Sequence, residues 1–92
     1  MRKRCNFYGT VQGVGFRYVT NVVAEKYGLY GWVRNNKDGS VTLVIEGLDD
    51  SIKFMIDYLK NFFHENIDKV EELEEKEERL CSFEIKHESR TF

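Results

Sequence analysis

A stretch near the amino terminus places two glycines and an arginine where they could bind an anion. The residues are Gly13, Gly15 and Arg17, within Gln-Gly-Val-Gly-Phe-Arg. Glycines adopt positive φ and let successive backbone amides converge on an anion, and the first turn of a helix adds unpaired N–H groups and a positive dipole end. An arginine fork suits two oxygens of one phosphate or carboxylate. We therefore predict an oxyanion-binding loop made of Gln12, Gly13, Val14, Gly15, Phe16 and Arg17.

The spacing of this loop excludes two common nucleotide-binding motifs. No Gly-Lys-Ser/Thr follows it, as a Walker A loop requires, and the third glycine of a dinucleotide fingerprint is missing. From the residues alone, a simple turn between a strand and a helix, with a solvated Arg17, is an equal alternative.

Asn35 is the second candidate for chemistry, because it ends an expected strand that could lie beside the loop. Its carboxamide both donates and accepts, so it can hold a water molecule directed at phosphorus. The alternative interpretation is that Asn35 merely opens a hairpin turn.

Three segments resemble the signature sequences of the acylphosphatase family: residues 9–17, 28–35 and 38–41. The resemblance implies metal-independent hydrolysis of the carboxyl–phosphate bond of acyl phosphates to a carboxylate and inorganic phosphate, with no cofactor and no phosphoenzyme. It also implies that the loop amides and Arg17 bind the phosphoryl group and that Asn35 orients the water, which makes Arg17 and Asn35 the catalytic residues. An acyl phosphate has a good carboxylate leaving group, so charge stabilisation and water placement should suffice.

The elements that must position these residues follow from hydrophobic periodicity. Cys5 and Phe7 alternate with polar residues, and Gly28 stands where a left-handed helix cap is expected. An Asp-Gly turn joins two further strands. The predicted elements are a strand over 3–8, a helix from 16 to about 27, strands over 30–35 and 40–46, and a helix capped by Asp49, Asp50 or Ser51 that runs to about residue 63.

The last third of the chain gives conflicting signals. Residues 70–78 contain six glutamates and favour a helix by composition, but a β-α-β-β-α order normally ends with a strand. We predict an edge strand here and a short final strand over 82–87. The fold class is then α+β, a ferredoxin-like βαββαβ sandwich with an antiparallel or mixed sheet of four to five strands and two helices on one face. The absence of proline departs from the Gly-Pro turn that is usual in the family and leaves the path of residues 61–92 open.

Length and charge limit the remaining possibilities. Ninety-two residues suit a single domain, 1–92. The net charge is −2, with +5 over residues 1–39 and −7 over residues 40–92, so the half that holds the loop favours a small anion. We expect no nucleic-acid or membrane partner, a monomer, and a cytoplasmic location, since no signal peptide or long apolar segment is evident.

The cysteines and histidines carry no metal-binding pattern. Cys5 and Cys81 are expected to be reduced, although a disulfide between them stays possible on sequence grounds. His64 and His87 are interpreted as surface or packing residues, and no metal site is expected.

Two alternatives to an enzyme remain from the sequence. The chain could be a non-catalytic module that binds phosphate or carboxylate, although such a binder has no need for a water-orienting amide. An RNA-binding domain of similar fold would need stacking aromatics, and residues 41–45 contain none.

Overall fold

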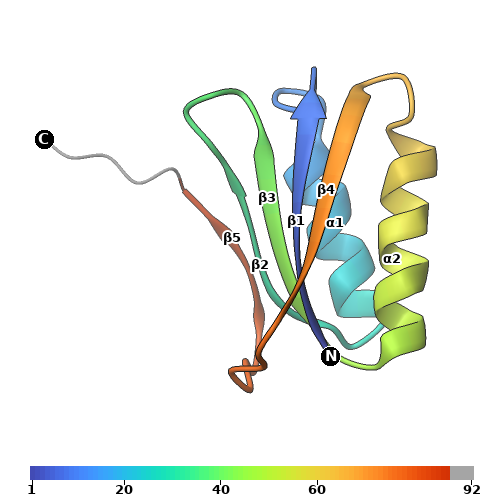
Figure 1. Cartoon of the computed structure of the whole chain (residues 1–92), viewed down its shortest axis with the longest axis vertical. Helices are drawn as coiled ribbons and strands as arrows, with labels where there is room; N and C mark the ends of the chain where they lie inside the picture. Colours follow the sequence, from blue (N-terminus) through green and yellow to red (C-terminus); the bar gives the residue numbers. More distant parts are fainter. Residues whose placement is uncertain (88–92) are drawn as a thin grey trace, which may run out of the picture.

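The computed structural model describes residues 1–87 and contains five strands and two helices (Figure 1). Their order along the chain is β-α-β-β-α-β-β. The elements are β1 (Arg2–Gly9), α1 (Phe16–Lys26), β2 (Tyr30–Asn35), β3 (Val41–Glu46), α2 (Asp49–Phe62), β4 (Ile67–Glu75) and β5 (Phe83–Lys86).

The strands form one sheet in the order β4-β1-β3-β2-β5. Neighbouring strands are antiparallel except for β5, which runs parallel to β2. The sheet is therefore mixed and five-stranded, and the predicted ferredoxin-like α+β class is confirmed. Both edge strands come from the last third of the chain, and the β4 edge matches the sequence prediction.

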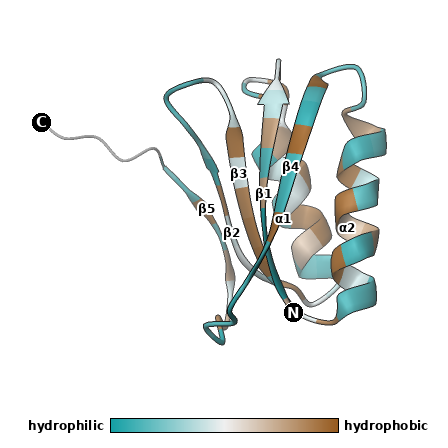
Figure 2. Ribbon diagram, in the orientation of Figure 1, coloured by the Kyte–Doolittle hydropathy of each residue, from teal (hydrophilic) through white to brown (hydrophobic). Residues whose placement is uncertain are grey.

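The hydrophobic core lies between the sheet and the two helices. Cys5 and Phe7 of β1 and Leu43 of β3 are fully buried there, and Ile52 and Met55 of α2 pack against the same cluster. Because side chains alternate along a strand and recur every three to four residues along a helix, these residues share one face of each element. Hydrophobic residues accordingly run along β3, whereas the connection after β4 is hydrophilic (Figure 2).

The face of the sheet opposite the helices is covered by long side chains of the strands themselves. Thr42, Val44 and Glu46 alternate with the core residues of β3, but they are buried as well. Arg2 reaches across to Glu46, with 3.3 Å between its Nη1 and the carboxylate oxygen Oε1. The Trp32 ring lies beneath the Arg34 guanidinium, 5.0 Å from it. A central strand thus becomes buried on both faces even though no helix covers the second.

Two predictions about element boundaries need correction. Strand β4 begins at Ile67 rather than near Val70, because its pairing with β1 extends to a bulge at Gly9. Helix α2 has Leu48 at its N-cap with no side-chain hydrogen bond, so the expected cap by an aspartate or serine is wrong. Asp49 and Asp50 instead lie in the first turn, where their charges favour the positive end of the helix dipole.

Strand β4 also ends at Glu75 rather than at residue 78, and the remaining boundaries agree with the sequence predictions to within one or two residues. Gly28 has φ +65°, as expected of a left-handed residue after α1. No helix within residues 1–87 is both long and apolar enough to cross a bilayer.

Candidate active site

The loop between β1 and α1 is fixed by the aromatic residue that begins the helix. Phe16 is buried, with its ring centroid 4.8 Å from that of Phe7 on β1 and 4.7 Å from that of Phe63 after α2. Val11, at the other end of the loop, is fully buried too. Two buried side chains therefore hold the loop at both ends, and the residues between them are left at the surface.

The backbone between these anchors has the conformation that the glycines predict. Gly13 and Gly15 have φ +79° and +84°, a left-handed region that costs other residues about 1–2 kcal/mol. Within residues 1–87, the amides of residues 12–17 donate no hydrogen bond to a protein acceptor. A run of unpaired N–H groups at the start of a helix is an anion-binding arrangement.

The Gln12 side chain attaches the loop to the β2–β3 hairpin. Its Nε2 donates to the carbonyl oxygens of Asn36 and Ser40, at 2.7 and 2.9 Å. The carboxamide of Asn36 in turn donates to the Thr42 hydroxyl, 2.7 Å away. These bonds fix the end of β2 relative to the loop, and Asn35 is the last residue of β2.

Hydrogen bonds also hold the tip of the same hairpin. The Asp38 carboxylate accepts from the Ser40 hydroxyl and from the Ser40 amide, which lies 2.9 Å away. These bonds hold the pKa of Asp38 below its ordinary value, so this carboxylate is charged at neutral pH. The charged carboxylate of Asp38 is therefore already hydrogen-bonded within the turn.

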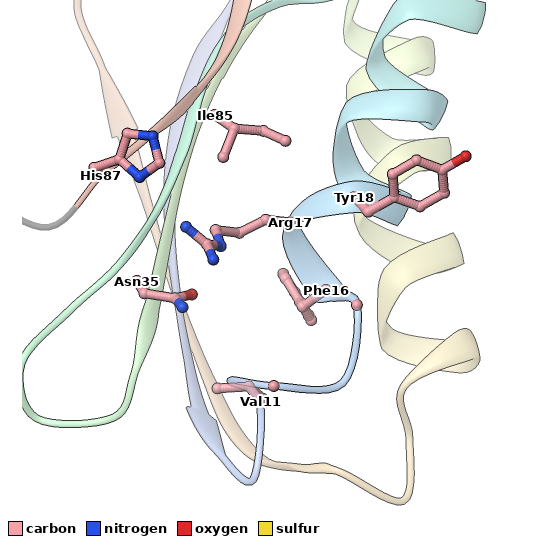
Figure 3. Close-up of a pocket in the computed structure, with 9 residues that line it drawn as sticks. Val11, Phe16, Arg17, Tyr18, Asn35, Ile85 and His87 are labelled. Carbon is pink, nitrogen blue, oxygen red and sulfur yellow. The ribbon is translucent and has the colours of Figure 1, made fainter.

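Arg17 and Asn35 line one pocket with a volume of about 280 Å³. Their side chains point toward each other across it, Arg17 from the first turn of α1 and Asn35 from the end of β2 (Figure 3). Among residues 1–87, no carboxylate pairs with Arg17 and its guanidinium donates no hydrogen bond. A fixed positive charge and a neutral amide are therefore available to a ligand.

The structure brings most of the predicted site together. Gly13, Gly15, Phe16, Arg17 and Asn35 all line the pocket. The Gln12 side chain is instead bonded to the hairpin, and Val14 is an exposed residue that does not line the pocket. Binding of phosphate by the Gln12 and Val14 amides stays a prediction.

Strand β5 adds a pocket wall that the sequence interpretation missed. Ile85 pairs with Val33 of β2, and both Ile85 and His87 line the pocket, as does Tyr18 of α1. His87 is exposed, as expected of a surface residue, and it also lines the pocket. Alternation from Phe83 and Ile85 would have placed His87 on the same side, but only with the knowledge that β5 runs beside β2.

Comparison with known proteins identifies both the fold and the family of the chain. Residues 3–85 match the family model for acylphosphatase. The acylphosphatase of Oceanobacillus iheyensis is 38% identical over 88 residues, which cover 91% of this chain and 96% of that relative. In other curated acylphosphatases the match spans less than two thirds of the relative, such as 61% for Bifidobacterium longum, where identity is 46%, and 50% for Bacillus licheniformis, where it is 56%.

Solved structures agree over nearly the whole length. The crystal structure of acylphosphatase from Bacillus subtilis superposes with a TM-score of 0.82 at 30% identity, covering 91% of this chain and 96% of that one. An acylphosphatase from Coxiella burnetii also has a TM-score of 0.82, at 31% identity, with coverage of 92% and 90%. The chain belongs to the acylphosphatase family.

Proposed function

We propose that the protein is an acylphosphatase that hydrolyses the carboxyl–phosphate bond of acyl phosphates to a carboxylate and inorganic phosphate. The observation that carries the proposal is that three features meet at one pocket: loop amides and an arginine that have no partner within residues 1–87, and a carboxamide. Each has a separate task in the reaction, and none of these tasks needs a metal.

The amides of residues 12–17 and the Arg17 guanidinium bind the phosphoryl oxygens. Charge on these oxygens is stabilised by donors that are already in position, so little reorganisation is needed during the reaction. Arg17 contributes a bidentate, charge-assisted contact.

Asn35 holds the attacking water. Its carboxamide oxygen accepts a hydrogen bond from the water and so directs the water oxygen at phosphorus. A new bond forms between the water oxygen and phosphorus, while the bond from phosphorus to the acyl oxygen breaks and its electron pair leaves with the carboxylate. An amide is not a base at neutral pH, so a phosphate oxygen takes the proton.

The same account bears on partners and location. The substrate is a small molecule, and we propose that the protein acts as a monomer without nucleic acid or membrane. Cys5 and Cys81 are both free thiols, Cys5 buried and Cys81 exposed, which suits a reducing compartment such as the cytoplasm.

A direct assay tests the proposal. The protein is incubated with benzoyl phosphate and EDTA, and the ultraviolet absorbance of the acyl phosphate is followed. We expect catalysed decay that Arg17→Ala abolishes and that Lys37→Ala, which removes a nearby exposed cation outside the pocket, retains. Absence of catalysed decay by the wild-type protein would favour the alternative, a non-catalytic anion-binding module.

A further inference from the structure

His87 occupies a position in the pocket to which the proposed mechanism gives no task. It follows directly after β5, on which Ile85 and Lys86 pair with Val33 and Arg34 of β2. In Figure 3 the His87 ring and the Asn35 carboxamide lie on either side of the Arg17 guanidinium. An imidazole, on an exposed side chain, thus shares the pocket with Arg17.

We propose that His87 is a second anion-binding residue, which takes up a proton when a dianion enters the pocket. The proposal rests on the proposed function, because it takes the pocket to be the phosphoryl site. A phosphoryl dianion beside the imidazole favours its charged form, so the anion and the proton bind together.

The charged and titratable groups around His87 support this coupling. From α1, Arg17 and Tyr18 line the pocket with it, and from β2 the residue that lines the pocket is the uncharged Asn35. The loop residues 11–16 carry no charge. On β5, Glu84 and Lys86 alternate with the pocket-lining residues and therefore lie on the opposite face of the sheet.

No carboxylate therefore lines the pocket among residues 1–87, and none there competes with the ligand for the imidazolium. Among the side-chain types that line the pocket, imidazole is the one that ordinarily changes charge between pH 5 and 8. The substrate class that follows is a dianion. Binding should weaken as the pH rises through this range.

Sulfate is the probe, because it is tetrahedral and stays a dianion throughout this pH range. Its affinity is measured by calorimetry at pH 5.5 and pH 8 in buffers of different ionisation enthalpy, so that proton uptake is counted directly. A coupling of one pKa unit would make sulfate bind about tenfold more tightly at the lower pH. We expect that ratio in the wild-type protein, with uptake of a fraction of a proton per sulfate, because a shift of one pKa unit changes the fractional protonation by at most about one half.

Two histidine variants form a matched pair. His87→Gln keeps a polar side chain of similar size, and we expect it to bind sulfate with less than about twofold difference between the two pH values and without proton uptake. His64→Gln removes the chain's other histidine, which is exposed, lies beside the Asn61 carbonyl oxygen and the Glu65 carboxylate outside the pocket, and should behave like the wild type. Wild-type proton uptake in His87→Gln would overturn the proposal.

A third variant separates this inference from the function on which it rests. Arg17→Ala should bind sulfate poorly at both pH values. If it instead binds sulfate as the wild type does, the pocket is not the anion site and the proposed function fails with it. If Arg17→Ala loses binding while His87→Gln keeps the wild-type pH dependence, the function stands and only the role of His87 is refuted.

Discussion

Replacing Gly15 tests whether the backbone conformation of the loop, rather than only its side chains, creates the anion site. Gly15 has φ +84°, and a Cβ placed there meets no atom within 4 Å. An alanine therefore fits by size, and its cost comes from the backbone alone, about 1–2 kcal/mol in the left-handed region. The reduced freedom of the unfolded chain offsets about 0.4–1 kcal/mol. We expect Gly15→Ala to lower the free energy of unfolding by about 1 kcal/mol.

The same strain should weaken phosphate binding. An alanine relieves it by rotating toward negative φ, which turns the neighbouring amides away from the pocket. Losing one hydrogen bond to a charged ligand costs about 1.5–3 kcal/mol, or roughly 10- to 150-fold in affinity. Urea denaturation and competitive inhibition by inorganic phosphate measure the two effects.

A glycine elsewhere in the chain supplies the control. Gly28 also has positive φ, +65°, and open space around a Cβ, but it lies at the other end of α1, outside the pocket. Gly28→Ala should lose about 1 kcal/mol of stability with unchanged phosphate affinity, and Gly15→Asn should keep most of the affinity because asparagine tolerates this conformation. Wild-type phosphate affinity in Gly15→Ala would refute the reasoning.

Two further predictions concern buried groups away from the pocket. Burial opposes ionisation of Glu46, but hydrogen bonds from the amides of Glu78 and Leu80 and from Arg2 outweigh it and hold its pKa below the ordinary 4.5. A lowered pKa in the folded state stabilises the protein above the unfolded value, so the free energy of unfolding should begin to fall below about pH 4.5. Glu46→Gln should lower the free energy of unfolding at pH 7 by about 2–3 kcal/mol, measured by urea denaturation, whereas Glu84→Gln, at an exposed position, should lower it little. Equal stability of the two variants would contradict the role of Glu46. Burial, with a smaller contribution from Glu72, raises the pKa of the Cys5 thiol to about 12. In the folded protein at pH 8, an aromatic disulfide reagent should therefore react with one thiol, that of the exposed Cys81. Rapid reaction of two thiols without denaturant would show that Cys5 is accessible.

The part of the fold that local sequence signals determine was predictable. Alternation identified β1 and β3, a helical stripe identified both helices, and the Asp38-Gly39 turn identified the hairpin. Gly13, Gly15, Arg17 and Asn35 line one pocket, but residue type alone left a simple turn as an equal alternative, and the resemblance to the acylphosphatase signatures made these residues candidates. Local rules were therefore sufficient for the elements but not for the site.

Strand β4 shows why local composition can mislead. Its glutamates favour a helix, yet Glu72 bonds both Lys3 of β1 and Lys60 of α2. Glu75 likewise bonds Arg2 and Arg4 of β1. These partners lie 12 to 73 residues away in the sequence, so their contribution cannot be read from the segment itself. Tertiary contacts here outweigh helix propensity.

The features of the site that the sequence interpretation missed also depend on tertiary contacts. His87 reaches the pocket only because β5 runs parallel to β2 at the sheet edge, and no short-range pattern states that pairing. Gln12 was expected to contribute as part of the loop, but the two bonds from its side chain to the hairpin depend on how the loop and the hairpin are placed in space. For both residues, the strand topology must be known before the role of the side chain can be interpreted.

The most direct test of the central claim is a single variant, Asn35→Ala, measured for both turnover and phosphate binding. If the carboxamide holds the attacking water in a pocket that the loop and Arg17 already make competent to bind phosphate, the two quantities must separate. We expect kcat for benzoyl phosphate to fall by a factor on the order of 10² to 10³, while the inhibition constant of inorganic phosphate stays within about twofold of wild type. Turnover close to that of the wild-type protein would contradict the account.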